Sequence, residues 1–410
     1  MAFDLFMLYD SFEDKVPRNW IKFGGEELMK KVREIVSDII KRGYTKQEIA
    51  KTISSELGVS SITISRELWE ILNNRWTGRE YYIPIPVLYQ LMKLWQPRQF
   101  ENKKFEVINL VERLVSNSSR SIPVKAVKNL STDLSKIAGA HAADGTLSKF
   151  KTSKNSSNYL WRVVDGDEDS LKALKLWIKN IFDISAKIKK SAYDNSYIIE
   201  IRNKVIFRYL NKMFEFKIGD KTSTVSIPYI IENSSLDNRR NFALGVMTFD
   251  GCVDAYGYVR LGVRSKKLRN VIVNLMREDS IDVRIDKSRK NEFSFRVNIF
   301  KNNTKILDYF AKNTIQWYRA KLFIDNLNTK NIFELFKGNK NNKITLERVL
   351  ETSKKLNIFD INLLIGQLGV SKRTLRAYLR ILEKSNFIEI NRDHHKLTYM
   401  YKNENHLHRV

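Results

Sequence analysis

The sequence has a single cysteine, few prolines and no long apolar run. Cys252 stands alone, so the chain can form neither an internal disulfide nor a zinc site made of cysteines. No apolar stretch approaches the roughly 18 residues that a membrane-spanning helix needs. The first twenty residues lack the basic start and apolar core of a signal peptide. We therefore expect a cytoplasmic protein with no membrane segment.

Acidic residues are scarce relative to basic ones. The 410 residues include 72 Lys+Arg against 46 Asp+Glu, a formal net charge of +26. Such an excess favours a polyanionic partner, with nucleic acid as the leading candidate. The alternative is a solvated basic surface that binds nothing. Because 43% of the residues are hydrophobic, the chain can also bury the cores of several domains.

Two stretches, Gly139–Gly145 and Gly245–Gly251, share the pattern G-x-x-x-x-D-G. Each belongs to an apolar run of helix length and ends on an acid and a glycine, Asp144-Gly145 and Asp250-Gly251. This pattern predicts a helix whose last turn presents one carboxylate. A carboxylate there faces the negative end of the helix dipole and is unfavourable without a cation. Two such ends brought together predict a site for a divalent metal.

The residues after each motif repeat the same order of elements. In the first copy we expect a basic segment after Gly145, a strand at Tyr159–Asp165, a helix at Asp167–Phe182, strands at Ile184–Lys190 and Tyr197–Arg202, and a helix at Val205–Phe214. In the second copy we expect a strand at Val253–Arg264, a helix at Lys266–Arg277, strands at Ile281–Lys287 and Phe293–Ile299, and a helix at Thr304–Lys312. The shared plan is α-β-β-α-β-β-α, twice.

Alternation along these strands separates an apolar face from a polar one. In the second copy Val259, Leu261, Val263, Ile281, Val283, Ile285, Phe293, Phe295, Val297 and Ile299 are expected to face the helices. The polar face then carries Tyr258, Arg260, Arg264, Arg284, Arg296 and Asn298, and in the first copy Arg162, Lys187, Lys189, Glu200 and Arg202. Any half-exposed antiparallel sheet turns polar side chains outward. The enrichment in arginine, which can bond guanine twice, favours a groove of duplex DNA.

The paired motifs and the repeated plan resemble the LAGLIDADG homing endonucleases in their single-chain, two-repeat form. The resemblance covers about residues 130–325 and implies an α+β fold with repeats at 131–232 and 233–328 forming a DNA-binding saddle. It implies that the motif helices pack side by side at a pseudo-twofold axis through small residues, among them Gly139 and Gly245. Close backbone approach of helices does require such residues.

The resemblance also implies an activity: site-specific cleavage of both strands of duplex DNA by a monomer with internal symmetry. The last acid of each motif, Asp144 and Asp250, would bind Mg²⁺ or another divalent metal, which activates water and stabilises the departing oxygen. Family members use a basic residue near each metal, and the candidates are Lys221 and, in the second copy, Lys312. Either lysine could instead contact phosphate or solvent.

Three motif positions depart from the family pattern. Ala142 and Thr248 stand where the family name has its first Asp, and Phe249 replaces the small residue before the second acid. The first-Asp position is not the metal ligand in the family, so the implied chemistry is retained. His141 lies inside the first motif and is interpreted as a structural residue.

The N-terminal flank, residues 1–100, has a helical pattern. Helices are expected at Glu26–Arg42, from Thr45 to Leu57, and from Ser61 onward, with a glycine turn at Gly58. This order is that of a helix-turn-helix, although a plain three-helix packing unit fits it as well. Prolines and the polar run 117–121 lead us to interpret 101–130 as a linker.

The C-terminal flank, residues 340–410, resembles a winged helix-turn-helix domain. After an Asn/Lys/Gly linker at 337–343, helices are expected at Leu346–Leu356 and from Ile361, then the turn Gly369-Val370-Ser371. The next helix, Lys372–Lys384, would present Lys372, Arg373, Arg376 and Arg380 to DNA. Strands at Phe387–Ile390 and Leu397–Tyr401 would form the wing. A basic helical bundle that touches no DNA is the alternative.

Two other functions remain open at this point: a DNA-binding transcriptional regulator built on the LAGLIDADG platform, and an RNA-binding intron maturase. An acid in both copies favours cleavage, because a pure binder gains nothing from carboxylates placed against phosphates. Self-splicing segments begin with a nucleophile and end with Asn. Met1 and Val410 do not fit, so we expect an intron-encoded or free-standing homing protein.

Overall fold

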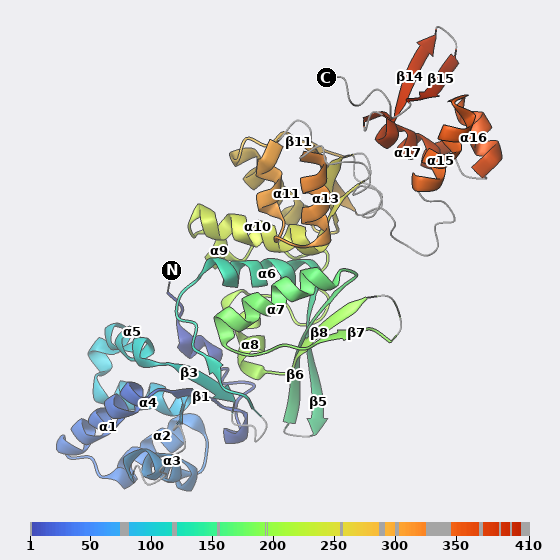
Figure 1. Ribbon diagram of the computed structural model, residues 1–410. Coiled ribbons are helices and arrows are strands. Elements are labelled where there is room, and N and C mark those ends of the chain that lie inside the picture. Colours follow the sequence, from blue (N-terminus) through green and yellow to red (C-terminus); the bar gives the residue numbers. More distant parts are fainter. Residues whose placement is uncertain are drawn as a thin grey trace. The chain divides into compact units, whose positions relative to one another are not determined.

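The computed structural model describes residues 2–73, 82–116, 121–153, 156–192, 194, 196–254, 257–286, 292–299, 303–324, 346–368, 372–384, 387–393 and 396–402. The chain divides into two compact units, Met1–Phe249 and Asp250–Val410. Every ladder between the named strands is antiparallel, and helices pack on the sheets (Figure 1). The predicted α+β class is therefore confirmed.

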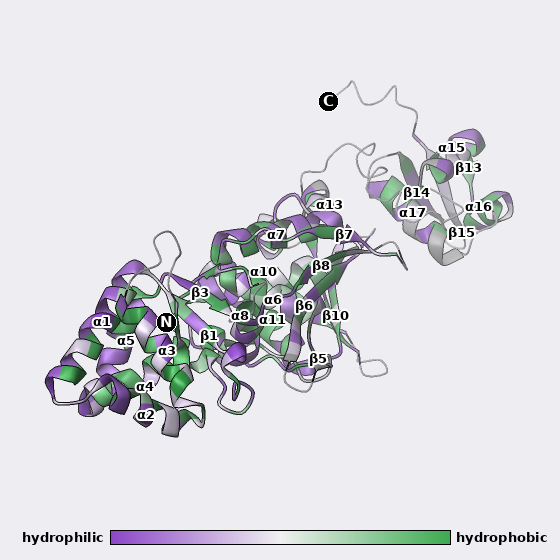
Figure 2. Ribbon diagram, turned by 90° about the horizontal axis from the view of Figure 1, so that it is seen from below, coloured by the Kyte–Doolittle hydropathy of each residue, from purple (hydrophilic) through white to green (hydrophobic). Residues whose placement is uncertain are grey.

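The N-terminal part of the first unit is a helical layer with one small sheet. Its elements are η1 (Leu5–Leu8), η2 (Pro17–Asn19), β1 (Ile21–Gly24), α1 (Glu26–Lys41), α2 (Lys46–Leu57), α3 (Ser61–Asn73), β2 (Tyr82–Pro84), α4 (Ile85–Trp95), η3 (Pro97–Gln99), α5 (Phe100–Leu110), β3 (Arg113–Ser116) and β4 (Val124–Lys125). The sheet order is β2-β1-β3-β4. Apolar and polar residues alternate along α1 at helical spacing (Figure 2).

Local capping explains why α2 and α3 are separate helices. Thr45 and Glu48 form a reciprocal capping box at the start of α2, and Gly58 ends it with φ of 63°. The helix–glycine–helix order is thus the predicted one. The interpretation of 101–130 as a linker is wrong, because α5, β3 and β4 lie there. Val107, Ile108 and Leu114 are buried, so this segment belongs to the core.

The first repeat follows. It contains α6 (Thr132–Asp144), β5 (Gly145–Ser153), β6 (Ser156–Asp165), α7 (Glu168–Phe182), β7 (Ile188–Lys190), β8 (Tyr197–Ile201), α8 (Lys204–Arg208), the π-helical turn η4 (Tyr209–Met213) and α9 (Tyr229–Glu232). The sheet order is β5-β6-β8-β7. The segment after Gly145, expected only as basic, is a nine-residue strand. α10 (Leu236–Asp250) then opens the second copy and, up to Phe249, belongs to the first unit.

The second repeat has β9 (Gly251–Val253), β10 (Tyr258–Val263), α11 (Lys266–Glu278), β11 (Val283–Ile285), β12 (Phe293–Asn298), η5 (Asn303–Tyr309) and α13 (Ile315–Ile324). Its sheet order, β11-β12-β10-β9, is that of the first repeat read from the other edge. Two expectations are corrected. Thr304–Lys312 is mostly a 3₁₀ helix, η5, rather than an α-helix, and Ile285 on the edge strand β11 is 43% exposed.

The C-terminal part of the second unit contains α15 (Leu346–Leu356), β13 (Ile358–Phe359), α16 (Ile361–Leu368), α17 (Lys372–Lys384), β14 (Ile388–Asp393) and β15 (Lys396–Tyr401). The sheet order is β13-β15-β14. A separate core is formed by side chains such as Val349, Leu364, Leu375 and Leu382. The expected linker 337–343 and the turn 369–371 lie outside the described residues.

None of the helices in the described part of the chain is long and apolar enough to cross a membrane.

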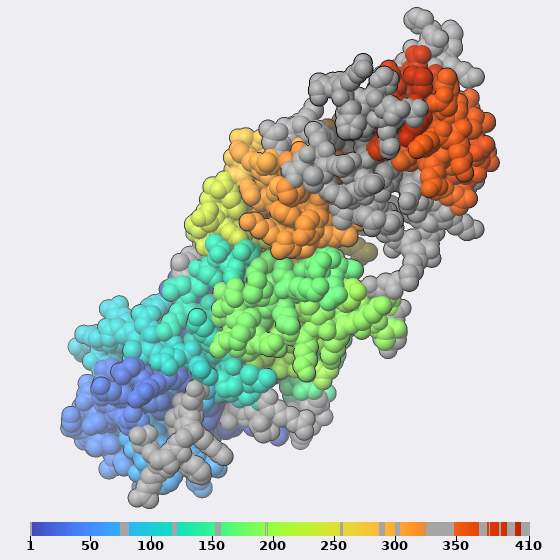
Figure 3. Space-filling view, in the orientation of Figure 1, coloured from blue at the N-terminus to red at the C-terminus, as the bar shows by residue number. Residues whose placement is uncertain are grey.

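A buried ion cluster joins the N-terminal segment to the first repeat. Arg208 of α8, only 1% exposed, binds Asp10 at 3.1 Å and Glu13 at 2.6 Å, and Lys204 pairs with the fully buried Asp14. The phenol of Tyr209 adds a hydrogen bond to the carbonyl of Val127 at 3.0 Å. Charge pairing therefore holds the two parts of this unit in contact. Figure 3 shows the N-terminal part, in blue and cyan, adjoining the first repeat, in teal and green.

Replacing Arg208 by methionine should destabilise the first unit by about 3–5 kcal/mol, because the loss of one partner leaves buried carboxylates uncompensated. Burial opposes ionisation of Asp10, but bonds from Lys212 and from the Glu13 N–H, with the Arg208 charge, hold its pKa well below the usual 3.8. A depressed pKa contributes its full stabilisation above the unfolded value, and this contribution is lost progressively as pH falls from there through the folded value. Thermal unfolding from about pH 5 down to about pH 2 should therefore show a steeper acid loss in wild type than in the variant.

The matched control is Arg98→Met, since Arg98 is exposed on η3. It should leave both the unfolding midpoint and its pH dependence unchanged. Equal behaviour of the Arg208 and Arg98 variants would contradict a stabilising role for the cluster.

Candidate functional site

The two motif helices, α6 and α10, meet at a pair of glycines. A Cβ atom added to Gly139 would lie 2.9 Å from the Cα of Gly245 and closer than 3.0 Å to the carbonyl of Phe242. A Cβ atom added to Gly245 would lie 2.9 Å from the Cα of Gly139 and closer than 3.0 Å to the carbonyl of Lys136. The helices are therefore in backbone-to-backbone contact, which only glycine permits here.

The contacts at this crossing are reciprocal. Gly139 meets Phe242, Gly245 and Val246, while Gly245 meets Lys136, Gly139 and Ala140. Each glycine therefore contacts the same three positions of the other helix. These are the glycine of the other motif, the residue three before it and the residue directly after it. Reciprocal pairing of this kind is what a twofold relation between two similar segments produces. The helix crossing thus has local twofold character.

Substituting alanine at Gly139 or Gly245 should push the helices apart. Overpacking a tight contact costs about 1–3 kcal/mol, so the apparent midpoint of thermal unfolding should fall by several degrees. The control is Gly166→Ala, where an added Cβ has no neighbour within 4 Å. Variants at the crossing that unfold at the same temperature as the control would show that the helices tolerate a wider separation.

Each motif helix ends on its acid. α6 ends on Asp144 and α10 on Asp250, and both acids are partly exposed. Gly145 has φ of −79°, so it is not a left-handed cap. Glycine is needed there for another reason: a Cβ would overlap His141, whose Cα would lie only 2.5 Å away.

Lys221 supplies the cation that the end of α6 requires. Its ammonium group is 6% exposed and donates to the carbonyls of Ala142 at 2.8 Å and Ala143 at 2.9 Å. These are two of the terminal carbonyls that a helix leaves without internal partners, and a positive charge there is favourable. The sequence candidate Lys221 therefore lies at the helix end that carries Asp144.

His141 belongs to the core of this helix end. Its ring is fully buried, and its centroid lies 4.3 Å from that of Phe216. Burial, together with the nearby Lys221 charge, holds its pKa well below 6.5, so the imidazole is neutral. This supports the interpretation of His141 as a structural residue.

The motif departures are accommodated by packing. Ala142 is 2% exposed, and Thr248, also 2% exposed, donates its hydroxyl to the carbonyl of Leu244 at 2.8 Å. Phe249 is 9% exposed. An acid at either of the first two positions would be buried, so their replacement removes no exposed carboxylate.

Replacing Lys221 by methionine should remove two charged hydrogen bonds from buried carbonyls. A bond to a charged group contributes about 1.5–3 kcal/mol, and a loss of this order should appear in denaturant unfolding. Lys217→Met is the control, because Lys217 is an exposed lysine of the same connection. Loss of stability in both variants alike would show that the effect is general to this segment.

In the second copy, different basic residues have to be considered near the end of the motif helix. Lys312, the candidate from the sequence, is exposed after η5. Arg319 belongs to α13, which packs against β9, and its charge, with that of Arg260, opposes the rise in the pKa of the Cys252 thiol that partial desolvation and Asp254 cause. Gln316 of the same helix accepts from the backbone N–H of Val253 at 2.8 Å. Sequence spacing missed Arg319, because only packing of α13 against β9 brings it there.

The second sheet presents the predicted polar face. Val259, Leu261, Phe295 and Val297 are buried, whereas Tyr258, Arg260, Arg296 and Asn298 are partly exposed and Arg264 and Arg284 fully exposed. Arg284, Arg296 and Arg260 stand directly opposite one another across β11, β12 and β10. Like charges in register repel, and two of these arginines are compensated by carboxylates outside the row, Arg260 by Asp254 at 2.7 Å and Arg296 by Asp286 at 3.2 Å.

The first sheet carries a mixed face. Arg162, Lys187, Lys189 and Arg202 are exposed, as expected. Arg162 is opposite Glu200 and donates its Nε–H to that carboxylate at 2.9 Å. The hydrogen bond and charge of Arg162, with Arg202 and Lys189, overcome desolvation and lower the pKa of Glu200.

The helices expected to read DNA in the two flanks, α3 and α17, differ in charge. On α17, Arg376 and Arg380 are exposed, while the side chains of Lys372 and Arg373 lie outside the described part of the structure. On α3, the exposed residues include Ile62 and Trp69, and Arg66 is paired with Glu70 at 3.0 Å. Among the described side chains, α17 thus exposes two arginines, whereas the arginine of α3 is paired with an acid of its own helix.

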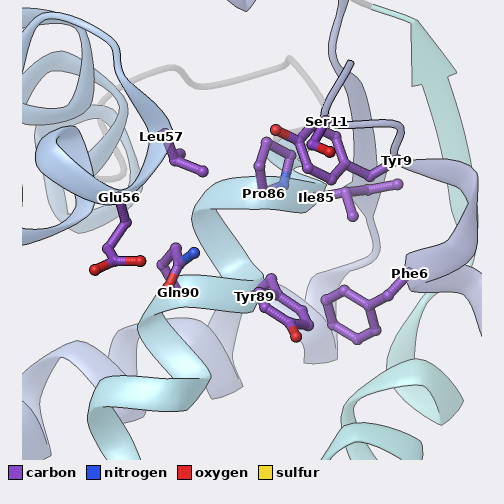
Figure 4. Close-up of a pocket in the computed structure, with 9 residues that line it drawn as sticks. All are labelled: Phe6, Tyr9, Ser11, Glu56, Leu57, Ile85, Pro86, Tyr89 and Gln90. Carbon is purple, nitrogen blue, oxygen red and sulfur yellow. The ribbon is translucent and has the colours of Figure 1, made fainter. Parts of the chain in front are cut away.

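A cavity of about 340 Å³ lies in the N-terminal part, away from the motif acids. Phe6, Tyr9 and Tyr89 line it with Glu56 and Gln90 from α2 and α4 (Figure 4). Its lining comes entirely from residues 6–90. Among the described residues no group of three or more His, Cys, Asp or Glu side chains is gathered in a way that could hold a metal.

The chain matches no protein-family model. A curated DNA polymerase of Thermococcus sp. (strain GE8) is 22% identical over 274 residues, which are 65% of this chain and 15% of the polymerase. The chain thus spans about 15% of the length of that relative.

Solved structures similar to the chain are LAGLIDADG homing endonucleases. I-DmoI in complex with DNA and Mn is 18% identical, with 42% of this chain and 93% of I-DmoI covered at a TM-score of 0.33. The LAGLIDADG meganuclease I-AabMI bound to uncleaved DNA is 11% identical, covering 51% and 97% at 0.32. The homing endonuclease I-WcaI bound to its DNA recognition sequence is 14% identical, covering 42% and 77% at 0.29. At these scores the likenesses are weak.

Proposed function

We propose that the protein is a site-specific, metal-dependent endonuclease that cuts both strands of duplex DNA, built from two LAGLIDADG-type repeats. The observation that carries this proposal is the reciprocal glycine crossing of α6 and α10, two helices that each end on one partly exposed acid. The same strand order in both sheets supports it, because it makes the acids equivalent members of two similar halves.

The residues present fit a hard divalent cation. Asp144 and Asp250 offer carboxylate oxygens, and Mg²⁺ commonly binds through one or two carboxylates with substrate phosphates and water completing its shell. Such a metal, when bound, lowers the pKa of water and stabilises charge on a departing oxygen.

The other residues would hold the substrate and the helix ends. Lys221 fixes the last turn of α6, and thus Asp144, while placing a positive charge beside it. Arg319 is the better candidate for the equivalent charge in the second copy, in place of Lys312. The arginines of the sheets would neutralise phosphates and contact base edges.

The C-terminal elements α15-β13-α16-α17-β14-β15 have the order of a winged helix-turn-helix domain. We assign it to DNA contact through Arg376 and Arg380, lengthening the recognised site. The N-terminal helices, with a weakly charged α3, would act as a packing extension. A cytoplasmic location and a monomeric state complete the proposal. We do not propose a polymerase activity, because this chain spans only 15% of the length of the DNA polymerase that it resembles.

The test is cleavage of a randomised duplex library by the full-length protein with Mg²⁺, read by sequencing the cut ends. Wild type should cut both strands at one sequence class. Asp144→Asn and Asp250→Asn should each reduce cleavage of one strand by at least about 100-fold, which corresponds to roughly 2.7 kcal/mol of barrier, and the double variant should bind without cutting. Asp237→Asn, an exposed acid in the first turn of α10, is the control and should cut normally.

Sequence-specific binding without cleavage, with any divalent metal, would replace the nuclease proposal by a transcriptional regulator. Preferential binding of structured RNA over duplex DNA would favour an intron maturase. Either outcome overturns the endonuclease.

A further inference from the structure

The strand registers align the two sheets residue by residue. In the first sheet Gly145 is opposite Val163, and Val163 is opposite Ile199. In the second sheet Gly251 is opposite Leu261, and Leu261 is opposite Phe295. Both rows of paired residues start at the glycine that follows the motif acid. Val163 therefore corresponds to Leu261, and Ile199 corresponds to Phe295.

The next row of each sheet therefore corresponds as well. In the first sheet it reads Thr146, Arg162 and Glu200, with Lys187 just before β7. In the second it reads Cys252, Arg260, Arg296 and Arg284. The rows share a basic residue on the second strand and on the edge strand. They differ at the centre, where Glu200 of one sheet corresponds to Arg296 of the other.

The central arginine of the second row is held for contact with a ligand. Arg296 is 32% exposed and is paired through its Nε with Asp286 at 3.2 Å, which leaves the outer edge of the guanidinium available. Arg260 is paired with Asp254 at 2.7 Å. Both guanidinium groups lie over the ring of Tyr258, at 5.8 and 5.9 Å. Fixed orientation lowers the entropy lost when these arginines bind a planar partner.

In the first row, the corresponding residues Arg162 and Glu200 form an ion pair with each other. Glu200 accepts two hydrogen bonds from Arg162, one of them at 2.9 Å, and the two residues are 19% and 47% exposed. The arginines of the second row are also paired with carboxylates, but Asp254 and Asp286 lie outside that row, whereas Glu200 is the central residue of the first row itself. The carboxylate of Glu200 also repels acceptor atoms, which guanine presents in the major groove at N7 and O6.

We propose that the second sheet selects guanine in its half of the DNA target at the row of Arg260, Arg296 and Arg284, whereas the first sheet does not select guanine at the equivalent position. The target is then non-palindromic at these two positions. This inference rests on the proposed function only in requiring that the sheets face duplex DNA.

The chemistry of the base edges gives the expected preferences. An arginine fork donates two hydrogen bonds to N7 and O6 of guanine, while a carboxylate accepts from N4 of cytosine. A good bidentate contact distinguishes the correct base by roughly tenfold or more. The half-site under the second sheet should therefore contain an invariant guanine, and the equivalent base of the other half-site should be cytosine or variable.

The experiment selects bound duplexes from a randomised library, using the full-length protein in EDTA so that bound DNA stays intact. Wild type should enrich guanine at one position of one half-site only. Arg296→Glu should lower that enrichment at least about tenfold. Glu200→Arg should create a guanine preference at the equivalent position of the other half-site. Thermal unfolding of each variant shows whether it is folded.

Arg296→Lys separates base reading from simple charge. Lysine keeps the positive charge but lacks the planar fork, so total affinity should be retained while guanine enrichment falls. A palindromic selected sequence, or guanine enrichment unchanged by Arg296→Lys and Arg296→Glu, would overturn this inference and leave the endonuclease proposal standing. Absence of any duplex binding would overturn both.

Discussion

The backbone contact between Gly139 and Gly245 is the constraint on which the motif helices depend. Each glycine stands five residues before the acid that ends its helix, so at 1.5 Å per residue each carboxyl-bearing residue lies about 7.5 Å along the axis from the crossing. The crossing therefore places two chemically equal helix ends at equal distances from one point. Any side chain larger than hydrogen at the crossing would increase the separation between the two helices, and with it the separation of their ends.

The C-terminal ends of the two motif helices also carry negative potential. A helix C-terminus concentrates unpaired carbonyls, and adding an acid there increases the negative potential. At α6 the buried ammonium of Lys221 offsets it by binding two of these carbonyls, leaving Asp144 partly exposed. A buried lysine that binds backbone carbonyls and a partly exposed acid thus occupy the same helix end.

The sequence predicted what depends on local patterns. The period of buried residues located α1, α7 and α11, the alternation located the faces of β10 and β12, and two G-x-x-x-x-D-G motifs located the ends of α6 and α10. The prediction from the sequence was wrong or incomplete where packing between segments far apart in the chain determines the structure. Residues 101–130 looked like a linker because polar and proline residues interrupt the pattern, yet β3 pairs with β1. Arg319 is far along the chain from the motif that α13 packs against.

The two repeats have the same residue where the motif helices contact each other and different residues on the outward faces of their sheets. Positions such as Gly139 and Gly245 are fixed by contact with the opposite helix, so a change at one would disturb both. Glu200 and Arg296 occupy matching positions on the outward faces of their own sheets. Residues at such positions do not take part in the glycine crossing, so a difference in charge between the two rows leaves that crossing unchanged. If the sheets bind DNA as proposed, this difference lets the two halves of the target have different sequences while the packing of the motif helices stays the same.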